Sequence, residues 1–124
     1  MLIEEELTGM IRSAAFAVHT ALGPGLLESC YEACLCHEFT KRGLSFKRQL
    51  ELPVIYDGIR IECGYRIDIL VEDKVVIEIK SVERLLPVHE AQLLTYLNLS
   101  GKRVGLLLNF NVTALKDGIV RRVA

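Results

Sequence analysis

Residues 66–81 constrain the fold more than any other stretch of the chain. They read "RIDILVEDKVVIEIKS", two apolar runs separated by a short charged segment. Apolar runs of this length around a charged turn are typical of a β-hairpin. Both runs nevertheless contain charges, Asp68 in the first and Glu78 and Lys80 in the second. We therefore expect two strands that turn an apolar face toward a core and a charged face away from it.

A three-residue loop sets the register of this hairpin. Val71 then faces Val75, and counting outward brings Asp68 opposite Glu78. Directly opposite residues of antiparallel strands have Cβ atoms about 4.5–5.5 Å apart on one face of the sheet. Lys80 shares that face because side chains alternate along a strand. The sequence predicts two carboxylates that point together beside a lysine, and a loop shifted by one residue breaks this match.

Spacing alone leaves two interpretations of the two carboxylates open. Like charges opposite each other destabilise a sheet unless positive charge lies between them. A divalent cation bound by both would supply that charge, and clustered carboxylates suit oxygen-preferring ions such as Mg²⁺ or Mn²⁺. Alternatively, both acids lie on a solvated face and pair with basic neighbours, namely Arg60, Arg66 and Lys80.

The rest of the chain predicts helices on both sides of a sheet. The expected elements are helices over 2–22, 26–43 and 88–101, strands over 46–56, 59–69, 74–81 and 103–110, and a last edge strand over 118–123. In the strand over 59–69, Ile59, Ile61, Cys63, Tyr65, Ile67 and Ile69 share one face, and Gly64 is a candidate position for a bend. "DG" at 57–58 is a hairpin turn signal. The order ααβββαβ(β), with a βαβ unit around the third helix, predicts an α/β (α+β) fold: a mixed central sheet flanked by helices in a single domain over 1–124.

Composition limits the classes of function. A net charge of -1 and a pI near 6.3 mean that a nucleic-acid partner must be held by a local patch or by metal ions. The cysteines lack zinc-ligand spacing and are expected to be small apolar fillers in a reducing compartment. The acidic amino terminus and the lack of a membrane-length apolar run favour a cytoplasmic protein with no membrane partner. A mean hydropathy of +0.31 favours a homodimer.

The hairpin resembles the motif of a nuclease superfamily. Asp68 and the tripeptide Glu78-Ile79-Lys80 are similar to the D…(D/E)-x-K motif of the PD-(D/E)XK nucleases, which have the restriction-endonuclease-like fold. Ile67 stands where the name of the motif has proline.

Two further motifs strengthen this resemblance. "GLLESCY" gives G-x-x-E-x-x-Y with Gly25, Glu28 and Tyr31, and "QLLTY" gives Q-x-x-x-Y with Gln92 and Tyr96. With these motifs the chain resembles the GxxExxY family, from the first helix to "LKDGIVRR" near the end.

The resemblance implies metal-dependent hydrolysis of a phosphodiester bond. It assigns Asp68, Glu78 and the backbone carbonyl of Ile79 to one or two Mg²⁺ or Mn²⁺ ions. Lys80 is assigned to the attacking water and the phosphate, and Glu28 to orienting the metal through water. Without the motifs, Glu28 is simply a favourable acid in the first turn of its helix.

Candidate substrate contacts lie on the third helix and beside Glu28. Gln92 and Tyr96 lie four residues apart and His89 three before Gln92, so all three share a helix face and offer polar groups to the phosphates of DNA or RNA. Tyr31 either packs or binds beside Glu28. Two other interpretations stay open: Tyr96 as a partly buried tyrosine with its hydroxyl in water, and His89 as a surface residue.

Three classes of function compete at this point. The intact set of acids with a lysine favours a nuclease. The small size and weak basic balance of the chain favour a regulatory module that binds nucleic acid or protein without turnover, because a fold does not fix a function. In the third class the carboxylates are structural parts of a scaffold subunit.

Overall fold

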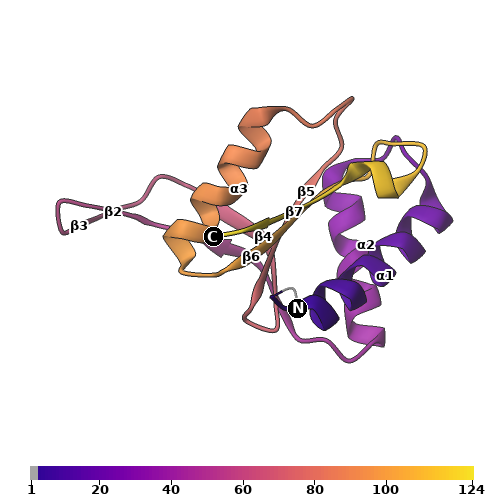
Figure 1. Cartoon of the computed structure of the whole chain (residues 1–124), viewed down its shortest axis with the longest axis horizontal. Helices are drawn as coiled ribbons and strands as arrows, with labels where there is room; N and C mark the ends of the chain where they lie inside the picture. The colour runs from indigo at the N-terminus through magenta and orange to yellow at the C-terminus, as the bar shows by residue number, and fades with distance from the viewer. Residues whose placement is uncertain (1–2) are drawn as a thin grey trace.

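The structure, a computed structural model, describes residues 3–124 and places a five-stranded sheet between two layers of helices (Figure 1). The elements are α1 (Glu5–Leu22), α2 (Glu28–Lys41), β1 (Phe46–Glu51), β2 (Val54–Tyr56), β3 (Ile59–Ile61), β4 (Arg66–Val71), β5 (Val75–Lys80), α3 (Pro87–Ser100), β6 (Val104–Asn109), the 3-10 turn η1 (Leu115–Gly118) and β7 (Ile119–Val123). The predicted α+β class is confirmed. The predicted helix start at Leu2 lies outside the described residues.

The five strands lie in the order β1-β4-β5-β6-β7. β4 runs antiparallel to β1 and to β5, β6 runs parallel to β5, and β7 runs antiparallel to β6. α3 forms the crossover from β5 to β6, because parallel neighbours need a long connection. The predicted hairpin register is confirmed, since Val71 pairs with Val75 and Ile69 pairs with Ile77.

Two apolar clusters hold the helices to the sheet. On one face α1 and α2 pack over the strands, where Ile11 and Phe39 join Ile77. On the other face α3 packs over them, where Leu93 joins Val76. Each fully buried side chain of this size contributes about 1.5–3 kcal/mol. β5 contributes Val75 and Ile77 to the first cluster and Val76 to the second, and this explains why three apolar residues follow one another at its start.

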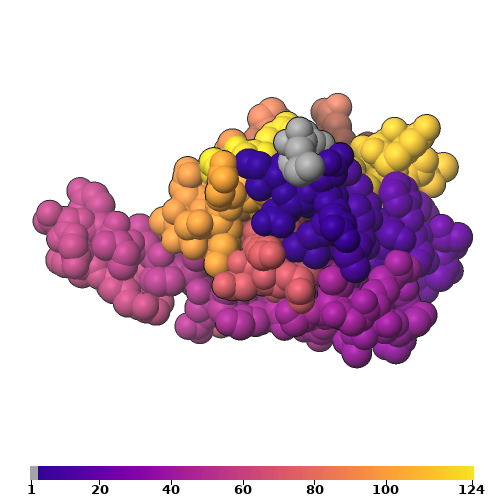
Figure 2. All heavy atoms as spheres, turned by 60° about the horizontal axis from the view of Figure 1, so that its bottom comes forward, coloured from indigo at the N-terminus to yellow at the C-terminus, as the bar shows by residue number. Residues whose placement is uncertain are grey.

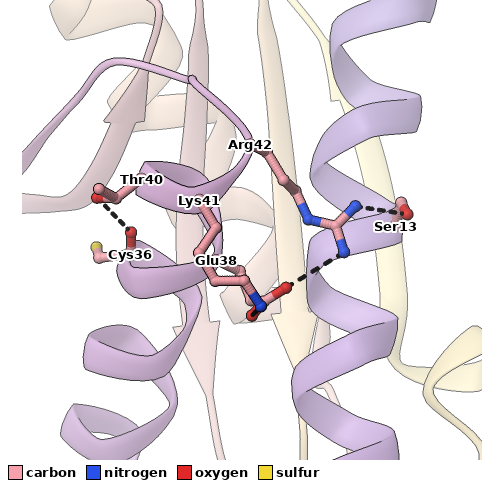
Figure 3. Close-up of polar contacts among 6 residues, drawn as sticks. All are labelled: Ser13, Cys36, Glu38, Thr40, Lys41 and Arg42. Atoms are coloured by element: carbon pink, nitrogen blue, oxygen red, sulfur yellow. Dashed lines mark hydrogen bonds and ion pairs between the residues drawn. The ribbon is translucent and has the colours of Figure 1, made fainter.

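Polar contacts fix the carboxyl end of α2 against α1 (Figure 3). Arg42 donates to Oγ of Ser13 at 3.0 Å and to Glu38 at 3.2 Å, and Lys41 pairs with Glu38 at 3.2 Å. Exposed pairs of this kind contribute at most about 1 kcal/mol each. The apolar cluster therefore supplies most of the stability of this helix pair. Within residues 3–124, none of the helices combines the length and the hydropathy needed to cross a bilayer.

The predicted strands over 46–56 and 59–69 are both wrong, because each segment divides between two separate sheets: β1 and β4 belong to the five-stranded sheet, whereas β2 and β3 do not. β2 and β3 make a two-stranded hairpin of their own, residues 54–61, which we call the arm. Figure 2 shows the arm standing clear of the rest of the molecule. Gly64 has φ +78, a left-handed conformation that interrupts the extended chain between β3 and β4. The predicted turn is confirmed, since Tyr56 pairs with Ile59 across it.

The single apolar face predicted for 59–69 is wrong as well. Ile59 and Tyr65 are exposed. Ile67 belongs to the cluster beneath α3, whereas Ile69 belongs to the cluster beneath α1 and α2. Residues two apart in a regular strand would share one face. β4 must therefore twist sharply around Asp68.

The side chains of β1 also switch from one face of the sheet to the other, at the position opposite Asp68. Phe46 packs on the side of α1 and α2, and Leu50 packs on the side of α3. Gln49, which lies between them and opposite Asp68 in the register, has φ +50. The twists of β1 and β4 therefore coincide at the row of the sheet that contains Gln49 and Asp68.

Candidate active site

Asp68 and Glu78, called the carboxylate pair below, lie where β4 and β5 separate. Backbone pairing of the two strands ends at Ile69 and Ile77, one step before them. Beyond that step, the N–H of Asp68 donates to Oε2 of Glu78 at 2.9 Å, and the N–H of Ile79 donates to Oδ2 of Asp68 at 2.8 Å. The two carboxylates therefore occupy the space between the strands, and an amide of the opposite strand fixes each of them.

Burial and mutual repulsion raise the proton affinity of the carboxylate pair. Glu78 is only 4% exposed, and desolvation, followed by the charge of Asp68, raises its pKa to about 8. Desolvation also raises the pKa of Asp68, against the lowering effect of its bond from the Ile79 N–H. The positive charge of Lys80 lowers both pKa values without cancelling the effect of burial. The positive charge near the carboxylate pair is therefore too small to keep the pKa values of both acids in their usual range.

α3 brings two of the predicted residues to the carboxylate pair. Nζ of Lys80 donates to Oε1 of Gln92 at 3.4 Å, a long and weak bond. Tyr96 is 5% exposed and packs on Tyr65 with the ring centroids 5.9 Å apart. Burial raises the pKa of Tyr96, and the charge of Glu78 raises it further. Both α3 residues thus lie within electrostatic or hydrogen-bonding reach of the hairpin.

α2 contributes the opposite wall of the site. Oε1 of Glu28 accepts a hydrogen bond from the N–H of Ser81 at 3.2 Å. A cavity of about 360 Å³ lies beside it, with the lining residues Glu28, Ser29, Glu32, Gln49, Asp68 and Ile79. Glu28 and Asp68 therefore line the same cavity.

Glu32 and Gln49 also lie at the site, although the sequence analysis did not select them. Oε2 of Glu32 accepts two hydrogen bonds from Arg48 at 3.0 and 2.9 Å, and its Oε1 accepts one from Nε2 of Gln49 at 2.7 Å. The same Nε2 lies 3.3 Å from Oδ1 of Asp68. A signal for Glu32 was present, because it follows Glu28 by four residues and so shares its helix face.

Tyr31 and His89 make contacts of a different kind. Tyr31 is fully buried, and its hydroxyl donates to the carbonyl of Gly23 at 2.5 Å and accepts from the N–H of Leu26 at 3.1 Å. Nδ1 of His89 accepts from the N–H of Leu86 at 2.9 Å, at the start of α3. These contacts favour packing for Tyr31 and a helix-start role for His89, and substrate binding by either stays a prediction.

Comparison with protein families decides the lineage of the chain. A family model described as the PD-(D/E)XK nuclease superfamily matches residues 5–123. The chain belongs to this superfamily. Comparisons with curated proteins and with solved structures found no match. The five-stranded mixed sheet with helices on both faces is consistent with the restriction-endonuclease-like fold of PD-(D/E)XK proteins. Membership of the narrower GxxExxY family stays a prediction.

PD-(D/E)XK nucleases generally use divalent metals, and the residues present suit a small, partly hydrated cation. Among residues 3–124, no three His, Cys, Asp or Glu side chains are arranged to enclose a metal ion. Mg²⁺ does not need such a cage, since it keeps several waters and is usually held by one or two carboxylates. The carboxylate pair offers these ligands, and Ile79, whose carbonyl was predicted to join them, lines the same cavity as Asp68. A divalent ion would also relieve the repulsion within the pair.

Proposed function

We propose that this PD-(D/E)XK protein is a Mg²⁺- or Mn²⁺-dependent nuclease that hydrolyses phosphodiester bonds of DNA or RNA. The observation that carries the proposal is the carboxylate pair itself. The two acids lie between β4 and β5, where each accepts a hydrogen bond from an amide of the other strand, and burial raises the pKa values of both. A buried charge without a matching partner is strongly destabilising. Two acids at one buried position are better explained by a cation that both would bind.

Three groups would hold the metal: the carboxylates of Asp68 and Glu78 and the backbone carbonyl of Ile79. When bound, the ion supplies a Lewis acid at the phosphate and lowers the pKa of water. The hydrogen bonds from the amides of Asp68 and Ile79 fix the two carboxylates before any ligand arrives. Such preorganisation means that little reorganisation is needed at the moment of reaction.

Lys80 would act on the attacking water and on the phosphate. Its charge lies close enough to the carboxylate pair to lower both pKa values, which supports a role next to the proposed metal ligands. Its only polar side-chain partner among the described residues is Oε1 of Gln92 at 3.4 Å. Because that bond is weak, the ammonium group can turn toward a phosphate oxygen or orient a water.

Residues of α2 and α3 would position the substrate from two sides. Gln92 and Tyr96 offer an amide and a hydroxyl on the side of Lys80, and such groups position a nucleic-acid backbone without reading its sequence. Glu28 faces the cavity from the other side and would orient the metal through water. A cationic metal also explains how a chain with a net charge of -1 accepts a polyanion.

The test is a cleavage assay on single- and double-stranded DNA and RNA, with and without Mg²⁺ or Mn²⁺. We expect cleavage only with a divalent ion, and its loss in Asp68→Asn and Lys80→Ala variants that remain folded at the temperature of the assay. Asp57→Asn, in the exposed turn of the arm, is the matched control and should cleave normally. An Asp68→Asn protein as active as the parent would overturn the assignment. Binding of oligonucleotides without cleavage of any of them would favour the regulatory module instead.

Three finer statements stay predictions: DNA rather than RNA as the substrate, a cytoplasmic location and a homodimer. The apolar residues Ile55, Tyr56 and Ile59 of the arm are exposed, and a second copy of the chain could cover them. Sedimentation of the parent and of a variant with serine at these positions tests the homodimer. A parent protein that sediments as a monomer at all concentrations would rule it out.

A further inference from the structure

Gln49 has a left-handed backbone conformation, φ +50, in the middle of β1. Residues with a side chain rarely adopt this region, because the Cβ atom approaches the following carbonyl oxygen. The pairing of β1 with β4 skips the same position, since Arg48 pairs with Ile69 and Leu50 pairs with Ile67. An observed strain of this kind often marks a functional site.

The side chain of Gln49 links α2 to the carboxylate pair. Its Nε2 donates to Oε1 of Glu32 at 2.7 Å and to Oδ1 of Asp68 at 3.3 Å. Glu32 is itself held, because Arg48 donates twice to its other oxygen and it is only 7% exposed. One amide nitrogen therefore joins an anchored acid of α2 to an acid of β4.

The two oxygens of Asp68 are fixed from different elements. The N–H of Ile79 in β5 holds Oδ2 at 2.8 Å, and Gln49 in β1 approaches Oδ1. The short bond from Ile79 sets the position of the carboxylate, and the longer contact from Gln49 at 3.3 Å restrains its plane. Partners that orient a metal ligand in this way typically change metal affinity or activity by about 10- to 100-fold when they are removed.

We propose that Gln49 is a positioning residue, whose amide, anchored on Glu32, sets the orientation of the Asp68 carboxylate. The role in metal binding rests on the proposed function, whereas the orientation of Asp68 does not. Glu32, which Arg48 holds by two hydrogen bonds, anchors the side-chain amide of Gln49. Gln49 also lines the cavity beside Asp68, and the role proposed for it is to orient that carboxylate, not to bind metal or phosphate.

A purely structural explanation makes a different prediction. In that case the left-handed residue serves only the twist that carries Phe46 and Leu50 to opposite faces of the sheet. Glycine adopts φ +50 without strain and has no amide, so Gln49→Gly keeps the twist and removes the link. Asparagine also tolerates this conformation, but its side chain is one methylene shorter and would not reach both acids. The two variants thus separate the backbone role from the side-chain role.

The experiment measures three quantities in Gln49→Gly and Gln49→Asn: the melting temperature, the hydrogen exchange of the Ile79 amide without metal, and Mn²⁺ affinity by calorimetry. Asp57→Gly is the matched control, because Asp57 has φ +53 in the turn of the arm. We expect all three variants to stay folded, because in the Gln49 variants the relief of backbone strain offsets part of the hydrogen bonding lost by Glu32 and Asp68. Only the Gln49 variants should show faster exchange at Ile79 and an Mn²⁺ affinity weakened by about 10- to 100-fold.

The outcomes separate this inference from the proposed function. Normal protection of Ile79 and parental Mn²⁺ affinity in both Gln49 variants would overturn the positioning role, even if the parent cleaves nucleic acid. A parent protein that binds no Mn²⁺ would contradict the proposed function. Faster exchange at Ile79 in the Gln49 variants would then still support the orientation of Asp68.

Discussion

Asp68 and Glu78 each use a carboxylate oxygen where a regular ladder would use a backbone carbonyl. The amide of Asp68 donates to Glu78 at 2.9 Å, and the amide next to Glu78, that of Ile79, donates to Asp68 at 2.8 Å. The strands part at this point without leaving those two amides unpaired, so the opening between them costs little in lost hydrogen bonds. The use of two carboxylates in place of backbone carbonyls concentrates negative charge in the interior of the protein. Most of the predictions below follow from that charge.

Without metal, the protein should become less stable as the pH rises. The pKa of Glu78 is about 8 in the folded state and near 4.5 when unperturbed, so between these values the folded state holds a proton that the unfolded state releases. The free energy of unfolding should therefore fall from pH 4.5 to pH 8, by a few kcal/mol at about 1.4 kcal/mol per pKa unit. The raised pKa of Asp68 acts in the same direction. Urea unfolding across this range, in chelator, measures the slope.

Glu78→Gln is the control for this pH dependence. Glutamine keeps the shape of the side chain and does not ionise, so the variant should gain stability relative to the parent at the alkaline end and lose most of the slope. A parent protein whose stability rises with pH over the same range would show that the carboxylates are instead stabilised in their charged form.

Mg²⁺ should reverse this loss of stability. A ligand that binds only the folded state stabilises it by about 2.7 kcal/mol at a concentration one hundred times its dissociation constant. Because the ion competes with protons for the carboxylate pair, the stabilisation should be larger near pH 8 than near pH 5. Thermal unfolding with Mg²⁺ and with a chelator measures it, and Asp68→Asn should abolish it. Equal stabilisation of the parent and the variant would place the ion elsewhere.

Lys80→Met should raise the pKa of Glu78 further and abolish cleavage. The charge of Lys80 lowers the pKa of both members of the carboxylate pair, and methionine keeps an apolar side chain of similar length without that charge. Carbon-13 NMR of labelled glutamate carboxyls measures the shift directly. Lys102→Met is a suitable control, because Lys102 pairs with Asp73 on the surface. An unchanged titration of Glu78 in Lys80→Met would contradict the placement of this lysine beside the pair.

The sequence was sufficient to predict that Asp68 and Glu78 lie together, because one known pair of opposite residues sets the register of a whole hairpin. The position of the charged turn supplied that pair, and Val71 does pair with Val75. Counting alternate residues failed over 59–69, where Ile59 and Tyr65 have the parity of a core face but are exposed. Alternation does not reveal where a strand twists or where a hairpin leaves the sheet. Gly64 indicated a bend, but its left-handed conformation and the separation of β3 and β4 into two sheets became visible only in the structure.

The sequence did not predict Glu32 and Gln49 as site residues, for a related reason. An acid in the middle of a helix is usually solvated, and only the packing of α2 over the sheet buries Glu32 against Arg48. Gln49 occupies a position that alternation gives to solvent, and its left-handed backbone has no signal in the residue type. The packing of α2 on β1 decides the contacts of Glu32, and the pairing of β1 with β4 decides the contact of Gln49 with Asp68; neither is contained in a local sequence pattern.

Tyr31→Phe and Tyr96→Phe should have opposite effects. The hydroxyl of Tyr31 holds Gly23 and Leu26 of the loop before α2, so its removal should cost about 1–3 kcal/mol of stability through unsatisfied backbone groups. Tyr96→Phe should cost less stability, because no protein partner of its hydroxyl is found among residues 3–124, and should impair cleavage instead. Urea unfolding and the cleavage assay together test this. A stable but inactive Tyr31→Phe would favour a substrate role for Tyr31.

The most direct measurement is a crystal structure of the protein soaked in Mn²⁺, with data collected for anomalous scattering. We predict a single strong anomalous peak between the carboxylates of Asp68 and Glu78, within ligand distance of both and beside the carbonyl of Ile79. The same soak of Asp68→Asn should leave the site without a peak. An empty site in the parent protein, with Lys80 turned onto the two carboxylates as their ion-pair partner, would contradict the account.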